Sequence, residues 1–192
     1  MKYYFLSIFC IGFLQLATAR NGADSTSPQG YYVETFRPPH TIKATFPFDI
    51  DLQDSAGRTT NSSKLLQNDG KTTTVLLFWL TTCGPCRMEM EAFEKNMEAW
   101  KNEVPNFRIV AISIDFSDNI PAFQRRVREA KWHFEAYHDR NREFQWVMPG
   151  NLNGLPQLFI YDKTGKVVFY KRRYIPGDEK EIFEKIKMSS QP

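Results

Sequence analysis

The chain has 192 residues, of which 42% are apolar and 24% are charged, as in soluble globular proteins that form one full-sized domain. The formal net charge is only +3, and the basic residues are spread along the chain. Because nucleic-acid-binding domains gather basic residues on one face, this composition argues against nucleic acid as a partner.

The N-terminus has the pattern of a secretory signal peptide over residues 1–19. Lys2 precedes an apolar run, and Ala17-Thr18-Ala19 supplies the small residues of a cleavage site. An uncleaved leader that tethers the protein to the membrane is the alternative, but a bilayer span needs about 20 apolar residues and this run is shorter. Cys10 lies inside the run behind bulky residues, so we do not expect it to carry a lipid. We predict an exported protein, periplasmic or otherwise extracytoplasmic, with no membrane span after cleavage.

The rest of the chain is predicted to be one domain between a linker and a short tail. Residues 20–40 are rich in Gly, Ser and Pro and have no periodic pattern, so we expect a linker or an irregular arm. Periodic apolar patterns place the domain at 41–188 and leave 189–192 as the tail.

Apolar spacing predicts the elements of this domain in chain order. The first is a strand at 45–52, where apolar and polar residues alternate. Residues 73–80 are apolar on both faces, as in a central strand of a covered sheet, and an amphipathic helix is expected from Pro85. The remaining elements are a buried strand at 107–115, a helix at 119–132, two strands joined by a hairpin turn at 155–162 and 166–174, and a helix at 177–188 capped by Asp178. This order predicts an α/β domain with a mixed central sheet and helices on both faces.

Two cysteines with the spacing Cys-Gly-Pro-Cys lie between the apolar strand and the helix. A bridge between Cys83 and Cys86 closes too small a loop to restrain the unfolded chain, so we do not expect it to serve stability. A thiol at a helix N-terminus faces free backbone N–H groups and the positive end of the helix dipole, which both favour the thiolate. Cys83 precedes the helix and is predicted to be the attacking nucleophile. Cys86, one turn into the helix, is predicted to resolve the mixed disulfide.

Metal binding and a non-catalytic role are the alternatives for this pair. A structural zinc site needs four ligands, and beyond the two cysteines the mature chain offers His40, His133 and His138. A copper carrier with two thiols and one histidine is equally disfavoured, so we predict no metal and no cofactor. A domain that only binds a partner, with a cysteine pair that has lost its exchange activity, remains a third hypothesis.

The segments 78–90 and 154–168 resemble those of thioredoxin-fold thiol–disulfide oxidoreductases of the TlpA/ResA type, which are exported or membrane-tethered. The resemblance extends over about 41–188. Within it, residues 117–148 match the helix-and-strand insertion of this group. The resemblance therefore implies a thioredoxin fold that carries this extra helix and strand.

The same resemblance assigns further site residues and marks where this chain differs. Pro156 corresponds to a cis-proline that faces the cysteines, and Leu155 before it and Thr82 before the pair are expected to contact the substrate. Relatives often carry threonine and tryptophan at these last two positions. Glu89 matches an acid frequent in this group and is a candidate for proton transfer, with a solvated surface residue as the alternative. Leu77 occupies the position at which thioredoxins have a buried aspartate.

The function that these expectations favour is disulfide exchange with other exported proteins. The dipeptide Gly84-Pro85 resembles that of reducing members, and ResA-like relatives reduce apocytochrome c before haem attachment. A reductase in an oxidising compartment would need a thiol donor in the membrane. An oxidase, an isomerase and a non-catalytic binding module are the alternatives. A peroxidase is not expected, because Leu76 and Leu80 replace the proline and threonine of the P-x-x-x-T-x-x-C motif.

Overall fold

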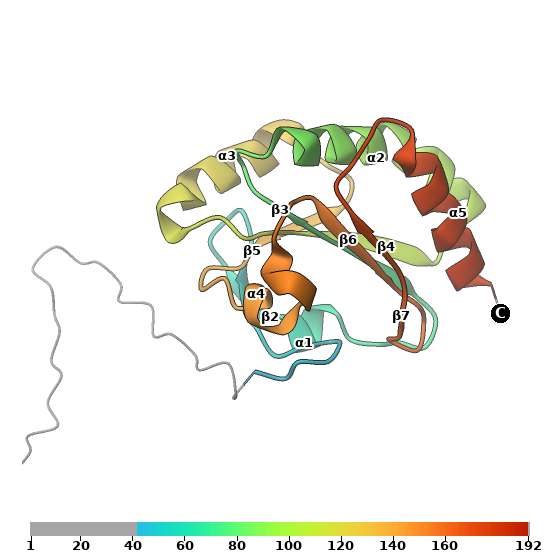
Figure 1. The fold of residues 1–192 in the computed structure, drawn as a ribbon, viewed down its shortest axis with the longest axis horizontal. Helices are drawn as coiled ribbons and strands as arrows, with labels where there is room; N and C mark the ends of the chain where they lie inside the picture. The colour runs from blue at the N-terminus through green and yellow to red at the C-terminus, as the bar shows by residue number, and fades with distance from the viewer. Residues whose placement is uncertain (1–41, 192) are drawn as a thin grey trace, which may run out of the picture. The chain divides into compact units, whose positions relative to one another are not determined.

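The computed structural model describes residues 42–191 (Figure 1). The predicted signal peptide with Cys10, the linker at 20–40 and His40 lie outside the described residues. Within 42–191, no helix has both the length and the apolar composition needed to cross a bilayer.

A mixed sheet of seven strands, in the order β2-β1-β5-β4-β3-β6-β7, forms the centre of the described domain. Strand β3 lies inside the sheet and pairs in parallel with β4 and antiparallel with β6. The strands are β1 (Asp51–Gln53), β2 (Thr59–Asn61), β3 (Thr73–Trp79), β4 (Phe107–Ser113), β5 (Glu135–His138), β6 (Gln157–Tyr161) and β7 (Val167–Arg172).

Helices cover both faces of this sheet, which confirms the predicted layers. Figure 1 shows the three long helices, α2 (Gly84–Glu103), α3 (Ile120–Ala130) and α5 (Asp178–Ser190), along one face, and the short helices α1 (Ser62–Leu65) and α4 (Phe144–Val147) on the other. Two short 3-10 helices are η2 (Ser117–Asn119), directly before α3, and η3 (Pro149–Leu152), after α4. Helix α3 and strand β5 supply the helix and strand predicted for residues 117–148.

The sheet has a hydrophobic core on each face, and strand β3 contributes side chains to both, as its uninterrupted apolar sequence predicts. All of its residues are buried. Alternate side chains point to opposite faces, so Leu77 and Trp79 join the core under α2 and α5, whereas Leu76 and Phe78 join the core on the other face. Because both faces are covered, the end of β3 is held in place where the cysteines follow.

Helix α2 forms where the three- and four-residue spacing of apolar residues predicts it. Met90, Phe93, Met97 and Trp100 are all buried against the sheet and α5. The indole of Trp100 stacks on Phe183 of α5, with ring centroids 4.9 Å apart. This packing fixes the axis of the helix whose first turn carries the cysteine pair.

The strand predicted at 45–52 is wrong in its first half. Phe48 donates its backbone N–H to Thr45 O at 2.8 Å and has a φ of +62°, so the chain turns where the alternation suggested an extended strand. Of the predicted range only Asp51 and Leu52 lie in a strand, β1, and it pairs with β2, which the sequence did not predict. Asp178 is not the cap of α5 either: Gly177 is the N-cap, and the Asp178 carboxylate accepts the backbone N–H of Ile175.

Candidate redox site

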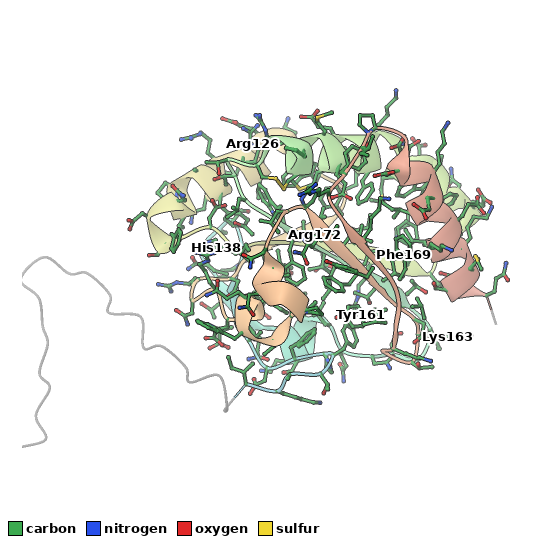
Figure 2. The ribbon with its side chains drawn as sticks, viewed as in Figure 1. Arg126, His138, Tyr161, Lys163, Phe169 and Arg172 are labelled. Atoms are coloured by element: carbon green, nitrogen blue, oxygen red, sulfur yellow. A yellow bond between two sulfur atoms is a disulfide. The ribbon has the colours of Figure 1, made fainter. Side chains whose placement is uncertain are left out.

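The two cysteines of the Cys-Gly-Pro-Cys sequence form a disulfide between the end of β3 and the start of α2 (Figure 2). Their Cα atoms are 5.3 Å apart. Cys86 is fully buried, whereas Cys83 is only half-buried and borders a groove. The predicted difference in exposure between the two sulfurs is therefore present.

The first turn of α2 favours negative charge on Cys83. Cys83 is the N-cap residue, and its Sγ accepts the backbone N–H of Cys86 at 3.2 Å. Pro85 lies at the start of the helix, where its missing N–H costs nothing. When the disulfide is reduced, the same N–H and the positive end of the helix dipole stabilise a thiolate at Cys83.

A buried carboxylate, Asp115, holds the loop that precedes the cysteines. Asp115 follows β4, and its two oxygens accept the backbone N–H of Thr81 at 2.8 Å and the Thr81 hydroxyl at 2.9 Å. The Ser113 hydroxyl also donates to Asp115, at 2.7 Å. Because Thr81 lies two residues before Cys83, these bonds tie the position of the nucleophile to the end of β4. Sequence reasoning missed Asp115, although an acid directly after a buried parallel strand was a visible signal.

The Leu155–Pro156 peptide bond is cis, as the resemblance implied, and it directly precedes β6. The carbonyl of Pro156 accepts the backbone N–H of Arg173 at 2.7 Å, which fixes this loop to the chain after β7. Among the described residues, neither the N–H nor the C=O of Leu155 has a hydrogen-bond partner. Leu155 and Cys83 line the same groove.

This groove, which we call the α4 groove, has a volume of about 540 Å³. Thr82, Cys83 and Leu155 line it, so three of the predicted site residues lie together. Its other lining residues are Leu80, Ile114, Arg142, Gln145, Trp146, Asn151, Leu152, Asn153 and Gly154. Most of these come from the segment around α4 and η3, which sequence analysis did not connect with the cysteines.

Glu89 is buried and is not the solvated surface residue that was the alternative for it. Its side chain lies on α2 three residues after Cys86, on the same helix face, and only 1% of it is exposed. Burial raises the pKa of Glu89 to about 8; the nearby Asp178 raises it further and Lys171 opposes the shift. Oε2 of Glu89 has no hydrogen-bond partner within 42–191. The carboxyl is therefore mostly protonated at neutral pH and close in pKa to a thiol.

Metal ligation finds no support in the arrangement of the described residues. Residues 42–191 contain no cluster of three or more His, Cys, Asp or Glu side chains with the spacing of a metal site. His138 is buried with its Nε2 at 3.0 Å from the carbonyl oxygen of Asp115, and His133 lies at the surface beside Glu94.

Comparison with known proteins gives a family match and a set of similar folds. A family model described as the AhpC/TSA family matches residues 42–170. A thioredoxin-like protein of Porphyromonas gingivalis is 28% identical over 74% of this chain and 90% of its own, with a TM-score of 0.62.

Two further solved structures are a thioredoxin-family thiol:disulfide interchange protein of Chlorobium tepidum TLS and a secreted Mycobacterium tuberculosis disulfide oxidoreductase homologous to E. coli DsbE. The first is 18% identical over 74% of this chain and 94% of its own, with a TM-score of 0.57. The second is 17% identical over 73% and 96%, with a TM-score of 0.55. These similarities confirm the α/β thioredoxin fold.

Proposed function

The chain belongs to the AhpC/TSA family, and on that basis we propose that it is a thiol–disulfide oxidoreductase acting on other proteins through Cys83 and Cys86. The observation that carries the proposal is the asymmetry of the disulfide. One sulfur borders an open groove, and the other is buried behind it. Such a pair offers one sulfur to a partner and retains the second for the return step.

In the reducing direction, the reaction starts from the dithiol form of the pair. The Cys83 thiolate attacks one sulfur of a substrate disulfide; that disulfide breaks, and its other sulfur leaves as a thiolate that takes up a proton. The Cys86 thiolate then attacks Cys83, which closes the intramolecular disulfide and releases the second substrate thiol. Two electrons pass to the substrate, so a two-electron donor has to reduce the pair before the next turnover.

The substrate chain is proposed to lie against Thr82, Leu155 and Pro156. The N–H and C=O of Leu155 are directed to no other described residue, and an extended peptide would pair with them as an added strand. This contact would place a substrate cysteine next to the Cys83 sulfur, because both groups line the α4 groove.

Glu89 is proposed to transfer the proton of Cys86. The resolving thiol is buried and has to lose a proton before it can attack, and Glu89 lies one helical turn further along α2. Because the pKa of Glu89 is about 8, a minor fraction of the carboxyl is ionised at neutral pH, and this ionised form accepts the Cys86 proton. The pKa is near the ordinary value for a thiol, so the transfer has little energetic cost. In this chain Glu89 would take the role of the buried aspartate that thioredoxins have at the position of Leu77.

We propose the reductase direction, on proteins exported to the compartment that the predicted signal peptide implies. The Gly84-Pro85 dipeptide supports this direction through its resemblance to reducing relatives, and reduction of apocytochrome c is the candidate pathway. The electrons would then come from a thiol donor in the membrane. Peroxide reduction is not proposed, because Leu76 and Leu80 replace the two motif residues that accompany a peroxidatic cysteine.

The deciding measurement is the reduction potential of the pair, obtained by equilibrating the protein with glutathione or dithiothreitol buffers. A value of about −250 mV or below supports a reductase, whereas one near about −120 mV makes the protein an oxidant of newly exported thiols. A pair that does not cycle between the two states would overturn exchange altogether and favour a binding module.

A further inference from the structure

The α4 groove beside the half-buried Cys83 sulfur carries positive charge and no negative charge. Its twelve lining residues include three side-chain amides, Gln145, Asn151 and Asn153, and a single charged residue, Arg142. None of the twelve carries a carboxyl group. A substrate that enters the groove therefore meets one positive charge and several hydrogen-bond donors.

Arg142 is held in place by stacking and not by a counter-ion. Its guanidinium carbon lies 4.0 Å from the centre of the Phe116 ring, and Phe116 is itself 64% exposed. Nε of Arg142 is buried without an acceptor among the described residues. The buried Asp139 interacts with Arg142 electrostatically, but its two oxygens accept the backbone N–H groups of Glu143 and Phe144. The Arg142 guanidinium therefore forms no hydrogen bond or ion pair with a described residue, and Arg142 lines the groove.

A second arginine, Arg172, does not line the groove itself but lies against Gly154, which does. Arg172 is exposed at the end of β7 (Figure 2) and makes no ion pair with any described residue. A β-carbon at position 154 would come within 2.5 Å of Nη2 and 2.6 Å of Nε of Arg172, so the guanidinium lies directly on the glycine. The neighbouring Lys171 differs, because it pairs with Asp178 at 3.3 Å and Glu181 at 3.1 Å.

We infer that the polypeptide substrate carries a carboxylate side chain close to its reactive cysteine, and that Arg142 and Arg172 select it. This inference rests on the proposed exchange function and names the chemical class of its substrate. Arg142 lines the groove and Arg172 lies against Gly154, the residue before Leu155, and neither forms an ion pair with a described residue. A carboxylate satisfies a guanidinium fork with two charge-assisted hydrogen bonds, which neutral side chains cannot do. A lysine on the substrate would instead meet like charge.

The test uses three synthetic peptides with the same intermolecular disulfide, flanked by Glu, by Gln or by Lys. The full protein, purified from the exported fraction and kept reduced by dithiothreitol, is assayed for kcat/KM on each. We expect the Glu peptide to exceed the Gln peptide by about tenfold, a typical effect of charge-assisted hydrogen bonds, and the Lys peptide to be slowest. The preference should shrink as the salt concentration rises from about 0.02 M to about 1 M.

Charge-removing variants locate the selectivity. In the double variant Arg142→Gln, Arg172→Gln, the ratio of the Glu to the Gln peptide should fall to about one. Arg128→Gln is the matched control, since it removes an exposed positive charge from the last turn of α3 and should keep the full ratio. Circular dichroism and the midpoint of thermal unfolding show whether the double variant is folded; if it is not, the salt dependence of the unmodified protein decides.

A ratio near one in the unmodified protein, or one that the double variant leaves unchanged, overturns the inference while exchange itself still proceeds. Failure to reduce any of the three peptides would instead overturn the proposed function. If glutathione disulfide is reduced as fast as the Glu peptide, the carboxylates are those of a small molecule, and the inference of a polypeptide substrate is wrong.

Discussion

On the α5 side of the disulfide the chain buries a carboxyl group, and on the α4 side it leaves a groove open to a partner. Glu89 on the first side is sealed from water and flanked by Lys171 and Asp178, which pair with each other. Arg142 on the second side stacks on Phe116 and lines the groove. Proton handling and partner recognition thus occupy separate surfaces, and the two cysteines divide between them, with Cys86 toward the first and Cys83 toward the second.

Substitution of the two cysteines is expected to have the largest effect on exchange activity. Cys83→Ser should lower exchange to the uncatalysed level, because the serine hydroxyl does not replace a thiolate nucleophile. Cys86→Ser should retain attack and accumulate a mixed disulfide with the natural substrate, visible as a reducible higher band on a non-reducing gel. If Cys86→Ser captures substrate no better than the variant in which both Cys83 and Cys86 are serine, the assignment of attacking and resolving roles is wrong.

The loop between the two sides depends on Asp115. Asp115→Ala should lower the free energy of unfolding by about 3 kcal/mol, because the partly buried N–H of Thr81 and the buried Ser113 hydroxyl lose their acceptor. Urea denaturation followed by tryptophan fluorescence measures this loss. Asp115→Asn keeps one acceptor oxygen and should cost less. A cost below about 1 kcal/mol for the alanine variant would mean that other contacts hold the loop.

The buried Glu89 on the α5 side should make the stability of the protein depend on pH. The pKa of Glu89 rises from 4.5 to about 8 on folding, chiefly through burial. Between these values the unfolded chain has lost the proton and the folded protein keeps it, so stability falls as pH rises, by up to about 1.4 kcal/mol per pH unit. Below about pH 4.5 both states are protonated and this contribution is fully present.

Glu89→Gln should remove this slope, and the difference between the two proteins isolates Glu89. Asp139, whose pKa burial raises to about 7, contributes equally to both. Urea unfolding at four or five values between about pH 5 and pH 8 provides the measurement. Parallel curves for the two proteins would show that Glu89 is not buried as an acid.

The smallest effect is expected on the α4 side, at Gly154. This residue has a φ of +79°, and Gly154→Ala should cost about 1 kcal/mol of stability for that conformation alone. The new methyl group would also displace Arg172, so the preference for a Glu-flanked peptide should weaken. Retention of the full preference in this variant would restrict selection to Arg142.

The elements of the fold that could be predicted from the sequence are those with a clear local pattern of apolar residues. Strand β3 is apolar without interruption and α2 repeats its apolar residues at helical spacing, so both were located closely. The alternation at 45–52 was misleading, because Phe48, Ile50 and Leu52 are all buried although only the last lies in a strand. Strand β2 is three polar residues long and offers no pattern to detect.

The site was predictable where its residues are neighbours in sequence or belong to a known motif. Cys83 and Cys86 are three residues apart, and their contrast in burial follows from the start of a helix. Contacts between residues far apart in the sequence could not be predicted: the hydrogen bond from Thr81 to Asp115 joins residues 34 positions apart. The burial of Glu89 likewise depends on how α5 packs, which one helix sequence cannot specify.

Strand β7 forms an edge of the sheet, and three of its apolar side chains, Val167, Val168 and Tyr170, are exposed. Such an edge has unpaired backbone groups that can recruit strands of other copies and start aggregation. Here the strand ends in Lys171 and Arg172, and charges on an edge oppose this pairing. The arginine assigned to substrate selection therefore also opposes pairing at this edge, so a change of its charge for a new substrate would weaken that protection.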